Sequence, residues 1–385
     1  MAISDDNKFN QYNRQGISMN FSLNRELLLR PLLLVSGAVE RKSTLPILGN
    51  ILLNITGNLL TLTATDLELE MVAHADIDNQ SVDGKITVPA RKLLDICKSL
   101  PEDSMINFRL DQQVIKLSTG RSKYSLLTLP AEDFPNIEEW RGDVGFKVLK
   151  SELLRLIEST HFSMANQDVR YYLNGMSIET ENNEIRSVAT DGHRLAICKI
   201  SNDSLALPSR QVIVPRKGIL EIIRLLDPVD EEIQVFLGSN HIRIIDSKFS
   251  FTSKLVDGRF PDYRRVLPRN GDKVMVANKE KLRQVLSRAS ILSNEKFKGI
   301  RLNFAHSLLK ITANNPEQEK AEEELEIDFP YDALEIGFNV SYVLDVLSAI
   351  KDSTVKFTLS DENSSVVIEG ANSGEALYVV MPMRL

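Results

Sequence analysis

A strand-then-helix pattern occurs three times in this chain at a nearly constant spacing, and this repetition limits the fold more than any other feature. In the middle copy, SRQVIVPRKGILEIIRLL (residues 209–226), a β-type run ends at Pro215 and an amphipathic helix follows. The copies ITVPARKLLDICKSL and IGFNVSYVLDVLSAI place Pro89 and Asn339 at the same point, 126 residues earlier and 124 residues later. A period of about 125 residues is too long for a solenoid repeat and fits a whole domain. We therefore predict one domain used three times.

Each copy is predicted to be an α+β domain in which two helices pack on antiparallel sheet. The segments NRELL, KSELL and NKEKL, which begin at residues 24, 150 and 278, each open a helix after a β-type run. Residues 66–77 alternate apolar and polar side chains, which predicts a half-buried strand. We place the domains at 19–144, 145–272 and 273–385. Residues 1–18 are polar and aperiodic, and we interpret them as a disordered N-terminal extension.

The charge distribution limits the classes of partner. A net charge of −7 argues against a protein that coats nucleic acid through bulk attraction, but it allows a local basic surface. No apolar run approaches the roughly 20 residues of a membrane-spanning helix, and the N-terminus does not resemble a signal peptide. We therefore expect a cytoplasmic protein without a membrane partner. Basic residues concentrate on the predicted helices: Arg25, Arg30, Arg91, Lys92, Lys98, Arg155, Arg216, Lys217, Arg224, Lys281, Arg283 and Arg288.

The sequence shows no pattern typical of catalysis or of a cofactor. The five histidines have no metal-ligand spacing, the two cysteines support neither a zinc site nor a disulfide framework, and no phosphate-binding loop or nucleophile motif occurs. In the segment TDGHR, Asp191 has counterparts at Asp66 and Asn315, which favours a turn at the end of a strand. His193 and Arg194 have no counterparts in the other copies. We predict a binding site there, with no catalytic residue, metal or cofactor.

Two further segments each allow two interpretations. Residues 317–328 hold seven acids and one lysine, and they are either a solvated loop with an edge strand or an edge matched to a basic partner surface. The C-terminal tail, VVMPMRL from residue 379, is unusually apolar for a terminus. It either packs back on the third copy or forms one wall of a cleft, opposite Leu173 and Val266 and with Arg384 at the rim.

These repeats resemble the bacterial sliding clamps, the beta subunits of DNA polymerase III. The resemblance covers residues 19–385 and rests on TLPILGN (from residue 44), QDVRYYLNGM (167), ATDGHRLA (189), FTSKLVDGRFPDYRRVLP (251), ILSNEKF (291), ITANNPEQE (311), FNVSYVLDVL (338) and YVVMPMRL (378). It implies three tandem clamp domains in each chain. It also implies a head-to-tail homodimer that closes into a ring around duplex DNA, with helices lining the hole. Such a ring is retained by topology, so it needs neither tight phosphate binding nor base readout.

The resemblance also implies two sets of site residues, and we predict a third from the edge strand of the first domain. The positions that face DNA are Lys42, where we expect an arginine in this family, and Arg91, Gln167, Tyr171, Tyr172, Arg216 and Lys217. We predict that the first domain pairs with the third domain of a second chain through Tyr124, Leu126, Ile291 and Leu292. The partner-peptide cleft lies between the second and third domains and takes Leu173, Thr190, Gly192, His193, Arg194, Leu195, Pro261, Arg265, Val266, Asn339, Tyr342, Val379, Met381, Pro382, Met383 and Arg384.

The implied function is that of a non-catalytic processivity subunit. Its partners would be double-stranded DNA without sequence preference, a second copy of the chain, the replicative polymerase alpha subunit, the clamp loader, translesion polymerases and mismatch-repair proteins, in a cytoplasmic protein associated with the nucleoid. Two alternatives from other classes are an acidic scaffold that binds only proteins and a three-domain enzyme. Trapping on circular but not on linear DNA would distinguish the clamp from both.

Overall fold

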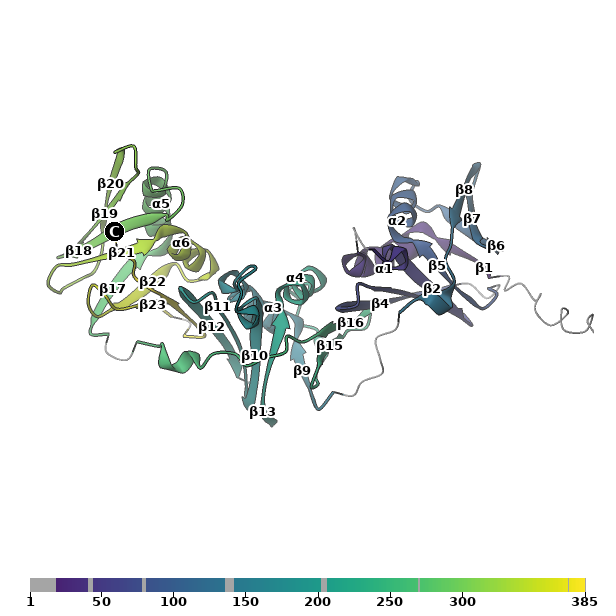
Figure 1. Ribbon diagram of the computed structural model, residues 1–385, viewed down its shortest axis with the longest axis horizontal. Coiled ribbons are helices and arrows are strands. Elements are labelled where there is room, and N and C mark those ends of the chain that lie inside the picture. The colour runs from purple at the N-terminus through teal and green to yellow at the C-terminus, as the bar shows by residue number, and fades with distance from the viewer. Residues whose placement is uncertain are drawn as a thin grey trace, which may run out of the picture. The chain divides into compact units, whose positions relative to one another are not determined.

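The computed structural model describes residues 19–40, 44–77, 81–135, 142–201, 206–268, 271–372 and 374–384 of the chain. The chain divides into two compact units, and Figure 1 labels helices and strands of each. The first contains the described residues up to Gly142 together with His241–Lys254. The second contains Asp143–Asn240 and the described residues from Leu255 onward. The predicted extension at residues 1–18 lies outside the described residues, as does Lys42.

The first unit has two α-helices and two sets of antiparallel strands in its described residues. The helices α1 (Arg25–Val35) and α2 (Ala90–Ser99) pack against each other. A four-stranded sheet has the order β1 (Asn20–Asn24), β6 (Met105–Asp111), β7 (Val114–Thr119) and β8 (Ser122–Leu127). The other strands pair in the order β5 (Gly84–Pro89), β2 (Asn50–Thr56), β3 (Leu59–Thr65), β4 (Leu69–Asp76), β16 (Phe249–Lys254) and β15 (His241–Ile245).

The second unit contains the second and third helix pairs and a large antiparallel sheet. Its helices are α3 (Lys150–Glu158), α4 (Arg216–Leu225), α5 (Lys279–Ser290) and α6 (Val340–Ala349). The large sheet has the order β13 (Leu207–Pro215), β10 (Gly175–Asn182), β11 (Glu184–Thr190), β12 (Arg194–Ser201), β24 (Ala376–Val380), β23 (Val366–Gly370), β22 (Thr354–Leu359) and β17 (Lys273–Asn278). A four-stranded sheet has the order β20 (Lys320–Glu326), β19 (Leu308–Asn314), β18 (Gly299–Ala305) and β21 (Leu334–Asn339), and β9 (Val144–Leu149) pairs with β14 (Glu232–Leu237).

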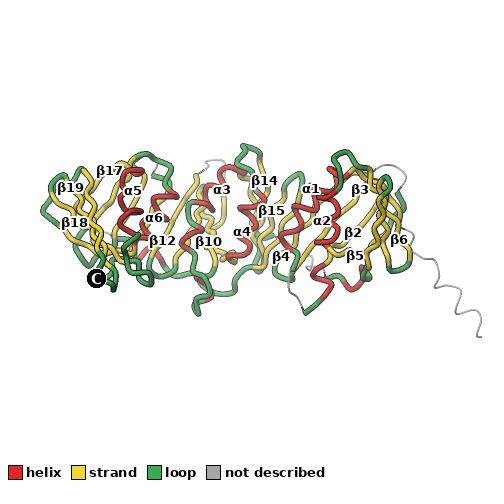
Figure 2. Tube along the Cα trace, turned by 90° about the horizontal axis from the view of Figure 1, so that it is seen from above, coloured by secondary structure: helices red, strands yellow, loops and turns green. Residues whose placement is uncertain are grey.

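The helices begin where the sequence provides a cap or a proline. The Asn24 and Asn278 side chains accept hydrogen bonds from the backbone N–H of Glu26 and Lys281, at 2.8 and 3.0 Å, and so cap α1 and α5. Pro215 precedes α4, which buries Ile219 and Ile222 on one face. The helices pack in pairs within each repeat, α1 with α2, α3 with α4 and α5 with α6 (Figure 2). The predicted α+β architecture with two helices in each repeat is confirmed.

The structure corrects the start of one predicted strand. The strand predicted for residues 66–77 starts later, at Leu69, because Asp66 accepts hydrogen bonds from the backbone N–H of Glu68 and Leu69 and forms a turn. The domain boundaries near residues 144 and 272 stay predictions.

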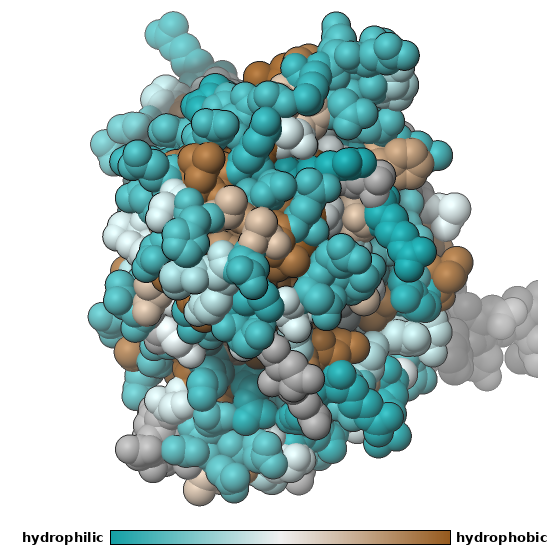
Figure 3. All heavy atoms as spheres, turned by 90° about the vertical axis from the view of Figure 1, so that its left-hand side faces the viewer, coloured by the Kyte–Doolittle hydropathy of each residue, from teal (hydrophilic) through white to brown (hydrophobic). Residues whose placement is uncertain are grey.

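The acidic segment of residues 317–328 forms an edge strand over most of its length. β20 is the end strand of its sheet, and its side chains alternate between exposed and half-buried positions. Figure 3 shows the face of the second unit at this end of the chain, where hydrophilic side chains predominate and apolar ones form small, separate patches. The segment is therefore both solvated and an available edge.

Gly175 provides a test of packing in the second unit. A Cβ on Gly175 would lie 2.6 Å from the Val214 carbonyl oxygen and 2.9 Å from the Ile213 Cγ2. We expect Gly175→Ala to lower the free energy of unfolding by about 1–3 kcal/mol, since the neighbouring backbone must move. Gly49→Ala is the control, because its new Cβ would meet only the Glu40 carbonyl oxygen at 3.9 Å. Urea titrations that show equal losses for the two variants would contradict this.

Candidate functional site

The second unit contains an apolar cavity where the second and third repeats share their sheet. Its volume is about 210 Å³. One wall comes from residues 255–268, which we call the connector, and another from the 3₁₀ turn η5 (Tyr171–Leu173). The lining residues are Arg170, Tyr172, Leu173, Thr190, Gly192, Arg194, Leu195, Pro261, Asp262, Tyr263, Val266, Ser365, Val379 and Met381.

The floor of the cavity is formed by the strand pair β12–β24. Leu195 lies opposite Val379 in this pair, and both side chains are buried. At the mouth, Val266 is 54% exposed and Met381 is 45% exposed. The cavity therefore combines a fixed apolar floor with apolar side chains that water reaches, an arrangement suited to small apolar groups.

The C-terminal tail is held at two points. The Met381 N–H donates to the His193 carbonyl at 3.0 Å, and the Met383 N–H donates to the Gly337 carbonyl at 2.8 Å. Met381 lines the cavity, whereas Met383 and Arg384 line a separate groove with Phe297. Met383 thus packs on the third repeat, and Met381 contributes to a wall of the cavity, so each interpretation of the tail holds for one residue. Arg384, expected at the rim of the cleft, lies in the separate groove instead.

The turn between β11 and β12 presents His193 and Arg194. Asp191 accepts hydrogen bonds from the backbone N–H of both residues, at 2.9 and 3.0 Å, which repeats the turn at Asp66. Gly192 has a φ of +90°, and a Cβ there would lie 3.1 Å from the Arg170 guanidinium. Glycine therefore fits this position on both counts.

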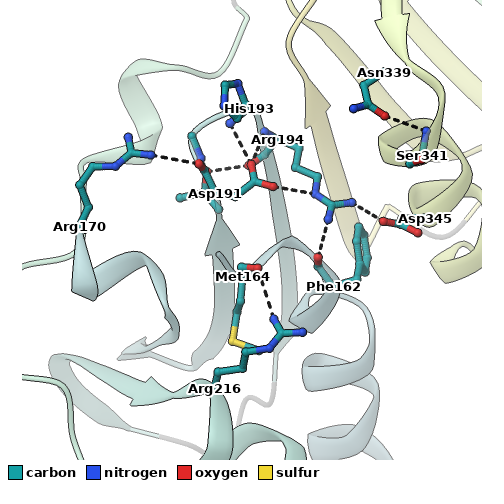
Figure 4. A network of polar contacts seen from close by, with 12 residues as sticks. Phe162, Met164, Arg170, Asp191, His193, Arg194, Arg216, Asn339, Ser341 and Asp345 are labelled. Carbon is teal, nitrogen blue, oxygen red and sulfur yellow. Dashed lines mark hydrogen bonds and ion pairs between the residues drawn. The ribbon is translucent and has the colours of Figure 1, made fainter. Parts of the chain in front are cut away.

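Arg194 joins the second repeat to helix α6 of the third (Figure 4). Its guanidinium donates to the Asp191 carboxylate at 3.0 Å and to the Phe162 carbonyl at 2.8 Å, and it also pairs with Asp345. It lies 4.5 Å from the centre of the Tyr342 ring. Since only 11% of the side chain is exposed, Arg194 mainly fixes the junction beside the cavity.

Three other predicted cleft residues lie around this junction. The His193 ring stacks on Tyr342 with the ring centres 6.3 Å apart. The Asn339 side chain accepts a hydrogen bond from the Ser341 N–H and caps α6 (Figure 4). Burial, and then the charge of Asp191, raise the pKa of Tyr342. His193, Asn339 and Tyr342 therefore border the site without lining the cavity, as do Arg265 and Pro382.

The cavity has five lining residues that were not predicted as part of the cleft: Arg170, Tyr172, Asp262, Tyr263 and Ser365. Side-chain and backbone hydrogen bonds from Arg170 lower the pKa of Asp168 to about 2, so this pair stays ionised and holds the turn before η5. Tyr263 lies in the motif FPDYRR. Nothing in this motif distinguishes a tyrosine that lines a cavity from one that packs in the core. Among the described residues no group of histidine, cysteine, aspartate or glutamate could hold a metal ion.

The predicted DNA-facing residues lie in both units. Arg91 and Lys217 are exposed on α2 and α4, and Gln167 is exposed with a φ of +58°. Arg216 is half-buried and donates to the Met164 carbonyl at 3.3 Å. Tyr171 is 57% exposed, but Tyr172 lines the cavity. Within the described residues the exposed members are therefore Arg91, Gln167, Tyr171 and Lys217.

The predicted self-association residues lie on or near exposed elements. β8 is the end strand of its sheet, with Tyr124 half-buried and Leu126 only 7% exposed. Leu126 would therefore contribute its backbone rather than its side chain to any pairing. Ile291 is 76% exposed at the end of α5, and the next residue, Leu292, is half-buried.

The fold and the cavity define a protein of three related α+β domains with an apolar cavity where two of them join. Three family models match the chain in order: the N-terminal domain of the DNA polymerase III beta subunit at residues 19–138, the central domain at 147–262 and the C-terminal domain at 264–384. The chain belongs to the DNA polymerase III beta subunit family.

Individual relatives agree over almost the whole chain. The beta sliding clamps of Pseudomonas aeruginosa and Escherichia coli K12 are each 55% identical over 367 residues, which cover 95% of this chain and all of each relative. The crystal structure of the P. aeruginosa beta subunit is similar with a TM-score of 0.94 at 54% identity, covering 95% of this chain and 100% of that one. The pol III beta of Caulobacter crescentus has a TM-score of 0.91 at 35% identity, with 95% and 100% covered. The expected class, a DNA sliding clamp that is not an enzyme, is confirmed by this membership.

The Arg194 junction can be tested by substitution. We expect Arg194→Ala to lower the free energy of unfolding by about 3 kcal/mol, since it leaves the largely buried Asp191 carboxylate without its cation. Asp345→Asn should cost less than about 1 kcal/mol, because the Asp345 side chain is 45% exposed. Urea denaturation of both variants and of the double variant gives the comparison. If Arg194→Ala loses no more unfolding free energy than Asp345→Asn, the ion pair of Arg194 with Asp191 does not stabilise the junction.

Proposed function

We propose that two copies of this chain close head to tail into a ring around duplex DNA, and that the ring recruits replication proteins through the cavity. The observation that carries this proposal is a pair of exposed sheet edges with opposite charge. β8 ends one four-stranded sheet and presents Lys123, whereas β20 ends another and presents Glu322, Glu324 and Glu326. Edge strands offer unpaired backbone groups, and opposite charges favour this pairing over β8 with β8 or β20 with β20. Such a contact is heterologous and closes when the rotation fits.

Contact with DNA in this proposal is weak and independent of sequence. The exposed cations Arg91 and Lys217 would meet phosphates, while the net charge of −7 keeps DNA from collecting on the rest of the surface. Few neutralised phosphates give a weak salt-dependent affinity, which suits a protein that slides. We place its action in the cytoplasm at the nucleoid. Among the described residues no helix is long and apolar enough to cross a membrane.

The cavity is proposed as the common site for partner peptides. Its volume of about 210 Å³ suits a few apolar side chains, and the flexible Met381 at its mouth would adapt to different ones. The replicative polymerase alpha subunit, the clamp loader, translesion polymerases and mismatch-repair proteins would then use one site in turn. Competition for a single site would order their access to DNA.

The ring is tested by retention on DNA. Loaded onto nicked circular duplex with a clamp loader and ATP, the protein should stay bound through gel filtration and be lost once the circle is cut. Replacing both Ile291 and Leu292 with alanine should shift the protein from dimer towards monomer in light scattering and lower retention, because their apolar contact area is lost. Val229→Ala is the control, since Val229 is another exposed apolar residue. Equal retention on linear and circular DNA would contradict the ring, and an unchanged dimer would place the interface elsewhere.

The cavity is tested with griselimycin, which is bound in a solved structure of the P. aeruginosa sliding clamp. We expect it to bind this chain and to lose about tenfold in affinity, or about 1.4 kcal/mol, in Met381→Ala. Met383→Ala is the matched control, because Met383 lines the separate groove. Calorimetry should find its affinity within about a factor of two of the unsubstituted protein, roughly 0.4 kcal/mol. Equal losses of griselimycin affinity in the two variants would show that the ligand does not bind in this cavity.

A further inference from the structure

A buried carboxylate lies behind the connector wall of the cavity, outside the set of lining residues. Glu179 on β10 is 7% exposed. It lies opposite Gln211 on β13 and opposite Arg186 on β11 in the sheet register. The Gln211 amide donates to its Oε1 at 2.8 Å, and an Arg186 nitrogen lies 3.9 Å from its Oε2. Two neighbouring strands therefore hold this carboxylate in place.

The connector reaches the same carboxylate through two side chains, Tyr263 at the shorter distance and Arg264 at the longer one. Tyr263 is 5% exposed, and its hydroxyl donates to the Glu179 Oε2 at 3.0 Å. The Arg264 guanidinium approaches the same oxygen at 3.5 Å. Burial, and then the charge of Glu179, raise the pKa of Tyr263 to about 12, so the hydroxyl keeps its proton and donates throughout the neutral range. A hydrogen bond from a neutral hydroxyl to a buried carboxylate is of the stronger, charge-assisted kind.

The remaining attachments of the connector show why this bond matters. Backbone hydrogen bonds tie its start to the unit, from the N–H of Leu255 to Asn240 and from the N–H of Val256 to Ile213. Further along, the backbone N–H groups of Tyr263, Arg265 and Val266 donate to carbonyls inside the connector itself. The far half is therefore held mainly by side chains, with Phe260 and Tyr263 packed in one apolar cluster with Leu195 and Val379.

We propose that Glu179 and Tyr263 are positioning residues that keep the connector wall in its binding-competent place, so that the partner cavity exists before a partner arrives. Apolar packing alone would not determine the orientation of the Tyr263 ring, because it is non-directional, whereas the hydrogen bond to Glu179 requires one orientation of the hydroxyl. Pro261 and Val266, on either side of Tyr263, then face the cavity. Without the bond only a fraction of molecules has the wall in place, and the apparent affinity falls by that fraction. This inference rests on the proposed function, because it takes the cavity as the partner site.

The test compares two tyrosines that each lose one oxygen atom. Tyr263→Phe removes the bond to Glu179. Tyr378→Phe is the matched control, because Tyr378 is also buried and lies on β24 next to the cavity residue Val379. Tyr378 packs in a different apolar cluster from Tyr263, and its hydroxyl is directed to Ser159. Hydrogen exchange of the backbone amides in residues 258–266 is measured first, in the free protein. We expect at least fivefold faster exchange in Tyr263→Phe and no change in Tyr378→Phe.

Binding of griselimycin is then measured on the same proteins. Tyr263→Phe should weaken it three- to tenfold, mainly through a slower association rate, since fewer molecules have the wall in place. Glu179→Ala should behave alike, and Glu179→Gln, which keeps an acceptor oxygen for Tyr263, should restore affinity to within threefold of the unsubstituted protein. If Glu179→Ala fails to fold, the tyrosine pair still decides the question.

The outcomes separate this inference from the function on which it rests. An unsubstituted protein that does not bind griselimycin would contradict the proposed site, while the exchange rates would still report on the connector. Unchanged exchange in Tyr263→Phe, or an equal loss of binding in Tyr378→Phe, would overturn the positioning role even if the cavity is the site.

Discussion

The pairing of β12 with β24 is the contact on which the second unit depends. It joins the second and third repeats edge to edge, with Arg194 opposite Val380 and Cys198 opposite Ala376, so that two domains share one antiparallel sheet. Each domain would otherwise leave a strand edge unpaired at this point. The shared ladder also explains where the cavity lies. Leu195 and Val379 form its floor because they are opposite each other in that ladder.

The repeats share a backbone plan, and the site arises where the middle copy departs from it. The turns at Asp66 and Asp191 make the same pair of hydrogen bonds. In the first copy Leu67 takes the positive φ, of 78°, whereas in the middle copy Gly192 takes it, at 90°. A leucine in that backbone region is strained, but its side chain has room there. Gly192 instead leaves space for Arg170, and the next residues direct Arg194 towards α6. The same turn occurs in two repeats, and in the middle one it also places Arg194 at the junction with the third repeat.

Much of the fold follows from the sequence because it depends on local patterns. The triple repeat predicts the α+β class, asparagines and prolines mark helix starts, and the Asp191 turn is recognisable from its counterpart at Asp66. Within the site, the apolar residues Leu173, Leu195, Val266, Val379 and Met381 are brought together as the resemblance implies. The contacts that each polar residue makes could not be predicted. Whether Arg194 faces solvent or α6, and whether Tyr263 meets a carboxylate, depends on elements that are distant in the sequence and close only after folding.

The two kinds of contact that such a clamp makes differ in their response to salt. Attraction between a few exposed cations and phosphates falls as the salt concentration rises, with a slope set by the number of phosphates neutralised. Burial of apolar side chains in the cavity has no comparable dependence. Raising the salt concentration should therefore loosen the protein on DNA while leaving partner peptides bound. A ring tolerates this imbalance because closure, rather than affinity, retains it on the duplex. The acidic composition of the chain is then compatible with a DNA-tethering role, and in the proposed ring the affinity for partner proteins would depend on one small apolar cavity.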